Sequence, residues 1–231
     1  MRFLILSVAL AAWGLAPALP AADAPKEGIV LAIVYDTSGS MRETVRDKSG
    51  SQTAKYIIAN RALQAVAAQI EKFATNQPAG GPEVQAGLYT FKVNSATPVV
   101  PMGKFDRAAF DKFAASFNSP NGNTPLGNSL SVAWQAVIAA PGARKHVLVI
   151  TDGANTEGPK PEETLPRLKQ QAASSGKSVS VHFVAFNVAA KEFNGVQKLG
   201  ATVVGAADEK QLDTQLDFIL QKKILLEDEE K

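Results

Sequence analysis

Cysteine is absent from this sequence, and histidine occurs only twice among its 231 residues. Without cysteine the chain can form no disulfide, no thiol nucleophile and no zinc–thiolate site. Two histidines are too few for a metal site built mainly from imidazole nitrogens. A metal centre in this protein would therefore depend on oxygen ligands.

A strong excess of one charge is also missing. The formal net charge is only +2, and no segment carries a stripe of lysine and arginine, so the composition does not favour a nucleic-acid partner. The chain is 45% hydrophobic and 20% charged, which is the composition of a folded protein with a substantial core. We expect a globular protein that binds no nucleic acid.

The first 22 residues have the pattern of a secretory signal peptide. Arg2 supplies a positive charge, residues 3–15 are apolar, and small residues and proline follow. Pro17 and Pro20 interrupt the apolar stretch before it reaches the about 20 residues that a spanning helix needs. We expect export to the periplasm or secretion, with an uncleaved anchor as the alternative. No second apolar span follows, so no membrane span is expected in the mature chain.

Apolar runs and helical patterns alternate from residue 28 onwards, which predicts an α/β fold with a doubly wound, mostly parallel sheet and helices on both faces. One domain over residues 27–226 accounts for the pattern, and a charged tail follows at 227–231. The segment 97–100 ends at Pro101 and follows the preceding strand too closely for a crossover helix, so we expect an antiparallel edge strand there. Strands are predicted at 29–35, 84–92, 97–100, 146–151, 179–186 and 201–204, and helices at 54–74, 106–117, 124–140, 161–175, 189–199 and 209–226.

A polar loop directly follows the first apolar run. Asp36, Ser38 and Ser40 stand at alternate positions there, at the carboxyl end of the predicted strand, where open α/β sheets bind their ligands. Carboxylate and hydroxyl oxygens in one loop suit Mg²⁺, Ca²⁺ or Mn²⁺. An ordinary polar turn remains the alternative, because Asp, Ser and Gly are common turn residues.

Two further oxygen ligands stand at comparable places in the pattern. The strand predicted at 146–151 ends at Asp152, and Thr124 precedes the helix before that strand. If the first and fourth strands are neighbours, both side chains approach Asp36. Each residue also has a local explanation: Thr124 can be an N-cap before Pro125, and Asp152 can be a turn residue before a glycine.

These three motifs together resemble the von Willebrand factor A domain family and its metal-ion-dependent adhesion site. That family has Asp-x-Ser-x-Ser, then Thr, then Asp, and this sequence has the same residue types at Asp36, Ser38, Ser40, Thr124 and Asp152. The resemblance covers essentially the whole mature chain. It implies a six-stranded sheet of order 3-2-1-4-5-6 with a short antiparallel third strand.

The resemblance also implies a function. The five residues would hold a divalent cation, for which we expect Mg²⁺, with Ca²⁺ and Mn²⁺ as alternatives. Two carboxylates balance such an ion, and an open coordination position would accept a Glu or Asp side chain of a partner protein. The expectation is therefore an exported, stand-alone protein-binding module that is not an enzyme.

Two other hypotheses stay open. A hydrolase would use Ser38 or Ser40 as the nucleophile with His146 or His182 as the base, although no nucleophile-elbow pattern surrounds either serine. An accessory factor that helps an exported enzyme mature would again be a binding protein. No phosphate-binding glycine motif follows any predicted strand.

Two loops are expected beside the five predicted ligands. Residues 42–53 follow the first motif and residues 155–160 follow Asp152. They could form the rim that selects the partner, or be solvated loops without contacts.

Overall fold

The structure is a computed structural model that describes residues 28–78 and 81–226. The predicted signal peptide at 1–22 and the charged tail at 227–231 lie outside these residues. Among the helices of the described ranges, none is both long enough and apolar enough to cross a membrane.

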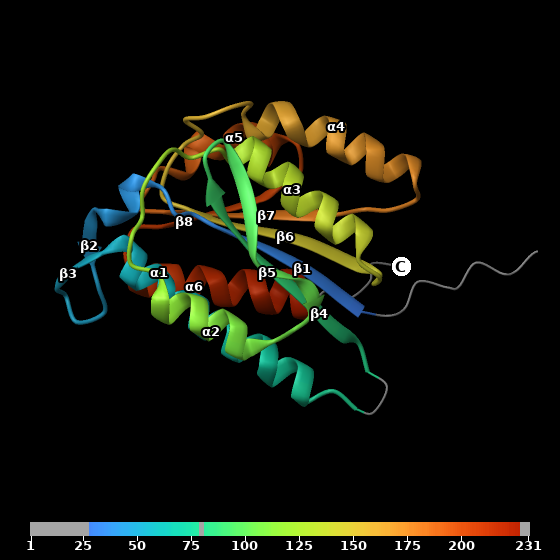
Figure 1. Cartoon of the computed structure of the whole chain (residues 1–231), viewed down its shortest axis with the longest axis horizontal. Helices are drawn as coiled ribbons and strands as arrows, with labels where there is room; N and C mark the ends of the chain where they lie inside the picture. The colour runs from blue at the N-terminus through green and yellow to red at the C-terminus, as the bar shows by residue number, and fades with distance from the viewer. Residues whose placement is uncertain (1–27, 79–80, 227–231) are drawn as a thin grey trace, which may run out of the picture.

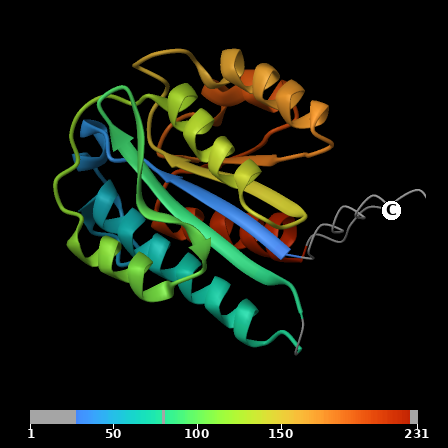
Figure 2. The same cartoon turned by 45° about the vertical axis from the view of Figure 1, so that its right-hand side comes forward.

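A six-stranded sheet forms the centre of the fold, with β1 at its middle (Figures 1 and 2). β1 pairs in parallel with β4 on one side and with β6 on the other. Within this sheet β5 alone runs antiparallel, on β4. The predicted order and edge strand are confirmed. In spatial order the strands are β5 (Ser95–Lys104), β4 (Glu83–Lys92), β1 (Gly28–Tyr35), β6 (Arg144–Thr151), β7 (Ser180–Phe186) and β8 (Thr202–Ala206).

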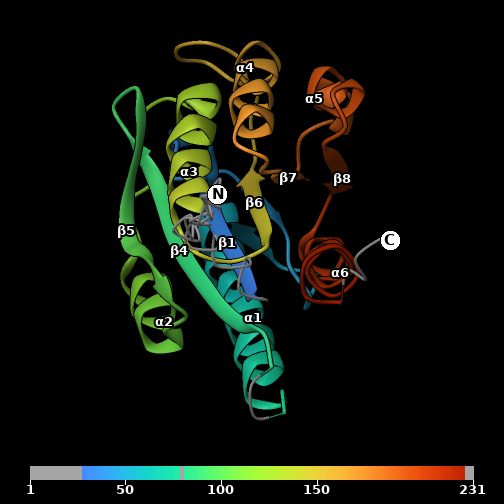
Figure 3. The same ribbon diagram turned by 90° about the vertical axis from the view of Figure 1, so that its right-hand side faces the viewer.

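Helices cover both faces of the sheet (Figure 3). β1 is wholly buried, and its side chains alternate between the two layers: Leu31 and Ile33 belong to one core, and Ala32 and Val34 to the other. An uninterrupted apolar run is therefore required here, because water reaches neither face. The first core is covered by α1 (Lys55–Thr75), α2 (Arg107–Ser116) and α6 (Glu209–Ile219), and the second by α3 (Leu126–Ala139), α4 (Pro161–Ser174) and α5 (Asn194–Lys198).

The edge strand is longer than predicted. β5 has 10 residues and includes Pro98 and Pro101. Its pairing with β4 shifts register on either side of Leu88. Since an edge strand has a side without ladder partners, it can include proline, which has no N–H to donate.

The segment 42–53 is only partly a loop. β2 (Thr44–Arg46) and β3 (Gln52–Ala54) form an antiparallel hairpin, which lies beside the start of α1 in Figure 1. Asp47 closes its turn by accepting hydrogen bonds from the backbone N–H groups of Ser49 at 2.8 Å and Ser51 at 3.0 Å. The sequence prediction missed this hairpin because both strands have only three residues.

Two predicted helices are divided. The fifth consists of a 3₁₀ turn, Ala190–Phe193, followed by the short α5. The sixth is α-helical to Ile219 and continues as a π-helical turn, Leu220–Leu225.

Both histidines are buried between the sheet and its helices. His146 of β6 and His182 of β7 stack with ring centroids 5.7 Å apart. Burial, together with the charge of His182, lowers the pKa of His146 to about 3, and burial together with the charge of Lys223 lowers that of His182 to about 4. Both imidazoles are therefore neutral in the folded protein near pH 7.

These pKa shifts predict acid destabilisation. Between about pH 6.5 and 4 the unfolded chain binds a proton at His182 that the folded chain does not, so stability falls as the pH falls. Between pH 6.5 and 5, His182→Gln should lose about 1.5 kcal/mol less stability than wild type, because it lacks this titration. Urea unfolding at the two pH values measures this. Val181→Ala, a buried neighbour without a titratable group, should leave the loss unchanged; a His182→Gln profile identical to wild type would contradict the prediction.

Candidate metal centre

The carboxyl ends of β1 and β6 place two buried aspartates side by side. Tyr35 pairs with Ile150 in register, and the N–H of Asp36 donates to the carbonyl oxygen of Ile150 at 3.0 Å. Asp36 follows β1 directly and Asp152 follows β6 directly. Their exposed fractions are 0% and 5%, so both carboxyl groups are largely removed from water.

Hydrogen bonds join these aspartates to the two serines. The Ser38 and Ser40 hydroxyl oxygens are 3.0 Å apart, and the Ser40 hydroxyl donates to Oδ1 of Asp152 at 2.7 Å. Oδ1 of Asp36 accepts from the backbone N–H of Ser38 at 2.7 Å. Four of the five predicted ligands thus form one connected cluster, although Ser40 and Asp152 are 112 residues apart in the chain.

Thr124 lies at the same cluster, but it is not a helix cap. α3 begins at Leu126, and Pro125 takes the N-cap position without a side-chain cap. Thr124 is instead held through its backbone: its N–H donates to Oγ1 of Thr156 at 2.9 Å, and its carbonyl accepts from the Thr156 N–H at 3.0 Å. The N-cap interpretation was therefore wrong by one residue.

The hydroxyl groups of Thr124 and Ser40 both lie close to Gly153. A Cβ atom placed on Gly153 would be 3.7 Å from Oγ1 of Thr124 and 3.9 Å from Oγ of Ser40. The fifth predicted ligand thus shares a small space with the other hydroxyl groups.

Two residues of the cluster were missed by the sequence analysis. Thr151, the last residue of β6, donates to Oδ2 of Asp36 at 2.6 Å. Lys55, the first residue of α1, donates to Oδ2 of Asp152 at 3.0 Å and to Oε2 of Glu43 at 2.7 Å. The sequence could have indicated that Lys55 is buried, because Lys55 stands three residues before Ile58 and so lies on the buried face of α1.

The electrostatics follow from this burial. Removal from water and the charge of Asp152 raise the pKa of Asp36 to about 6, against the hydrogen bonds from Ser38 and Thr151. Burial lowers the pKa of Lys55, but its hydrogen bonds to Glu43 and Asp152 outweigh this, so its pKa lies above the usual value. The cluster therefore holds closely spaced negative charge that a cation would stabilise.

The donor set fits a hard divalent cation. It offers two carboxylates and three hydroxyl oxygens, with no nitrogen or sulfur ligand, and such donors suit Mg²⁺, Ca²⁺ or Mn²⁺. Within residues 28–78 and 81–226 no group of three or more His, Cys, Asp or Glu side chains could hold a metal. The three hydroxyl groups are therefore part of the candidate donor set, beside the two carboxylates.

A second loop packs directly on the serine loop. The N–H of Gly39 donates to the carbonyl of Gly122 at 3.1 Å, and Nε of Arg42 donates to that of Pro120 at 2.6 Å. A cavity of about 300 Å³ lies here, lined by Arg42 and residues 118–121. The cavity lies beside the cluster of predicted ligands, and Arg42 gives this part of the rim a positive charge.

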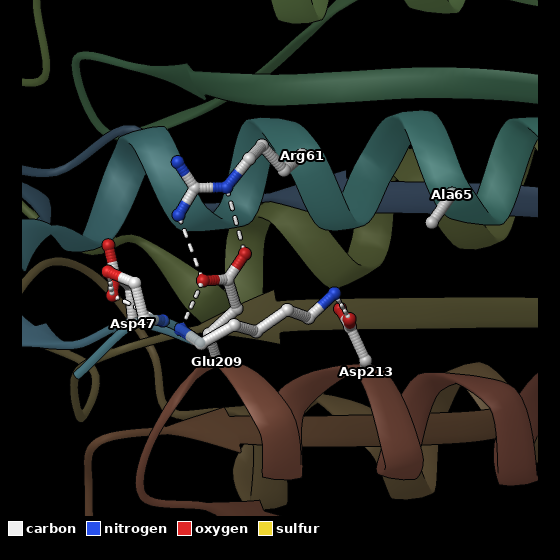
Figure 4. A pocket seen from close by; sticks show the side chains of 7 residues that line it. Asp47, Arg61, Ala65, Glu209 and Asp213 are labelled. Atoms are coloured by element: carbon white, nitrogen blue, oxygen red, sulfur yellow. Dashed lines mark hydrogen bonds and ion pairs between the residues drawn. The ribbon is translucent and has the colours of Figure 1, made fainter. Parts of the chain in front are cut away.

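Another cavity of about 300 Å³ lies away from the five predicted ligands, between the β2–β3 hairpin, α1 and α6 (Figure 4). Glu209, at the start of α6, accepts from Nε and Nη2 of Arg61 at 2.8 and 2.9 Å and from the N–H of Lys48 at 3.0 Å. Lys48 also forms an ion pair with Asp213. These contacts anchor the hairpin to α6.

This chain matches the model of one protein family, and it is similar in fold to several solved structures. The model of the von Willebrand factor type A domain matches residues 31–155. The PilB minor pilin from Streptococcus sanguinis (D319A mutant) is similar in structure, with a TM-score of 0.62, 15% identity and coverage of 84% of this chain and 60% of that one. The chain thus spans less than two thirds of that pilin. No curated protein sequence matches.

Two other solved structures share the fold. The vWF domain of the type V pili tip protein Mfa5 from Porphyromonas gingivalis has a TM-score of 0.62 and 13% identity, with 86% of this chain and 95% of that one covered. Proximal thread matrix protein 1 from the mussel byssus, solved with a zinc-occupied MIDAS motif, has a TM-score of 0.54 and 14% identity, with 85% and 48% covered. At these identities the likeness establishes the fold.

Mg²⁺ should stabilise the protein through this cluster. At about 100 times its Kd, Mg²⁺ should raise the Tm relative to EDTA by roughly 5–10 °C. Asp36→Ala should abolish the rise, whereas Asp111→Asn, on α2, should preserve it. Thermal unfolding followed by circular dichroism measures all three. An equal Mg²⁺ response in Asp36→Ala and wild type would show that the ion binds elsewhere.

Proposed function

The chain belongs to the von Willebrand factor type A domain family, and on this premise we propose that it is an exported protein-binding module that uses a divalent cation. The observation that carries the proposal is the hydrogen-bonded cluster of Asp36, Ser38, Ser40 and Asp152 at the ends of two neighbouring strands, with Thr124 beside it.

Asp36, Ser38, Ser40, Thr124 and Asp152 are the proposed ligands, with Mg²⁺ as the preferred ion. A bound ion would supply an electrophilic, open position for an oxygen ligand from outside. The protein's own task is to orient its donors. Thr151 and the N–H of Ser38 hold the two oxygens of Asp36, and Ser40 holds one oxygen of Asp152.

The proposed partner presents a Glu or Asp side chain. Such a carboxylate would complete the coordination of the ion and neutralise its remaining charge. The Arg42 guanidinium is held by Pro120 at the rim, where its planar donors suit a second acidic or carbonyl group of the partner. Residues 155–160, whose Thr156 is bonded to Thr124, form another proposed part of the rim.

We propose an exported location, periplasmic or secreted, from the leader-like first 22 residues. Two of the similar structures are named as a minor pilin and a pili tip protein, which supports a role outside the cytoplasm. An accessory role in the maturation of an exported enzyme is one form that such binding could take.

Hydrolysis by Ser38 or Ser40 has weaker support. His146 pairs in register with Leu31, seven residues before Ser38, and both histidines have pKa values far below neutrality for the reason given above. The Ser38 hydroxyl is bonded to Ser40. We therefore propose that the chain is not an enzyme.

Partner capture should depend on the metal. Immobilised wild-type protein should retain its partner from the native source in Mg²⁺ and release it in EDTA. Asp36→Ala should lose the partner in both buffers, and Asp111→Asn should behave as wild type. Quantitative mass spectrometry of the eluates measures this. If the partner is retained equally in EDTA and by Asp36→Ala, metal-bridged binding is refuted. Esterase turnover that is lost in Ser38→Ala would favour the hydrolase.

Reversing the rim charge should weaken partner binding without affecting the ion. Arg42→Glu places a negative charge where an acidic partner would dock, so the partner Kd should rise at least about tenfold. The Tm shift produced by Mg²⁺ should stay as in wild type. Arg167→Glu, on the exposed side of α4, is the control. If Arg42→Glu binds the partner with unchanged affinity, Arg42 is not part of the interface.

A further inference from the structure

The cluster contains a buried lysine that the proposed ligand set does not use. The Lys55 side chain is 3% exposed, and its Nζ lies 3.0 Å from Oδ2 of Asp152 and 2.7 Å from Oε2 of Glu43. A lysine is rarely buried to this degree unless it is paired with an acid. Since the Glu43 side chain is 67% exposed, the buried partner of Lys55 is Asp152.

The two carboxylate oxygens of Asp152 therefore accept from different donors. Oδ1 accepts from Ser40 and faces the hydroxyl cluster, whereas Oδ2 accepts from Lys55. Among residues 28–78 and 81–226 no lysine or arginine pairs with Asp36 in this way, and its oxygens accept from Ser38, Thr151 and the N–H of Asp152. Of the two buried negative charges, one is therefore balanced by a positive charge of the protein itself.

We propose that Lys55 is a built-in counter-cation of the metal centre, which keeps the cluster folded without metal and limits its affinity for divalent cations. This inference rests on the proposed function, because it presumes that the cluster binds such an ion. With Lys55, the two aspartates present a net charge of −1 rather than −2 to the incoming ion. The metal-free cluster is then less self-repulsive, and the bound ion is held less tightly.

The geometry gives Lys55 this role rather than that of a simple support. Two carboxylates buried together without a cation would repel each other and would each lack their hydration. Lys55 relieves that repulsion in the metal-free state. In a metal-bound state Lys55, which is bonded to Oδ2 of Asp152, would repel the ion because both are positively charged. The charge of Lys55 should therefore stabilise the metal-free protein and weaken the binding of the ion, and both effects can be measured.

Replacing Lys55 should tighten metal binding while weakening the metal-free protein. Lys55→Met keeps most of the side-chain stem and removes the charge. It should lower the Tm in EDTA and decrease the Kd for Mg²⁺ by about tenfold or more. Lys55→Arg keeps the charge and should bind Mg²⁺ with nearly the wild-type Kd. Isothermal titration calorimetry with MgCl₂, paired with thermal unfolding in EDTA, gives both quantities.

A second buried lysine provides the matched control. Lys145, at the start of β6, donates from Nζ to the carbonyl oxygens of Val137 at 2.9 Å and Ala140 at 2.6 Å. Lys145→Met should lower the Tm and leave the Kd for Mg²⁺ unchanged. If Lys55→Met does not fold, Lys55→Gln, which retains hydrogen-bonding capacity without the charge, should show the same tightening.

The outcomes separate this inference from the proposed function. If wild type binds Mg²⁺ normally but the Kd for Mg²⁺ is unchanged or higher in Lys55→Met or Lys55→Gln, the counter-cation proposal is overturned and Lys55 is only a structural support. Wild-type protein that binds no Mg²⁺ would overturn both proposals.

Discussion

The parallel pairing of β1 with β6 is the contact on which the candidate site depends. It sets Tyr35 beside Ile150, so that the two strands end at the same level and Asp36 comes beside Asp152. Because the side chains of β1 fill both cores, a slip of one residue would exchange its two faces and move Asp36 away. Core packing therefore also secures the position of the carboxylates.

Close placement of two acids creates an electrostatic cost that the surrounding residues offset. The hydroxyls of Ser40 and Thr151 and the N–H of Ser38 donate to the carboxylates, and Lys55 brings a full positive charge to one of them. Burial and the charge of Asp152 raise the pKa of Asp36, so the ionised form of this carboxyl group is disfavoured in the metal-free cluster. A divalent ion would offset the repulsion between the two carboxylates, and this is the physical basis for proposing one.

Much of this arrangement was predictable because it is encoded in local patterns. The buried run before Asp36 and the second run before Asp152 both indicated central strands, and the short connection before Thr97 indicated an antiparallel edge. The bounds were less accurate: β5 extends through two prolines, and Pro125 rather than Thr124 occupies the N-cap position of α3. Edge ladders and tertiary hydrogen bonds decide such details, and neither has a strong local signature.

The sequence by itself determined the alternation of strands and helices, the two strands that end in aspartate, and a set of oxygen donors without nitrogen or sulfur competitors. Apolar periodicity and residue chemistry are properties of short segments, so they can be read from the chain directly. Only the tertiary structure decided that Thr151 and Lys55 join the cluster, that Thr156 holds Thr124, and that a hairpin follows the serine loop. These contacts link segments up to 115 residues apart. Their partners are brought together by the packing of α1 and β6 around β1, which no local pattern specifies.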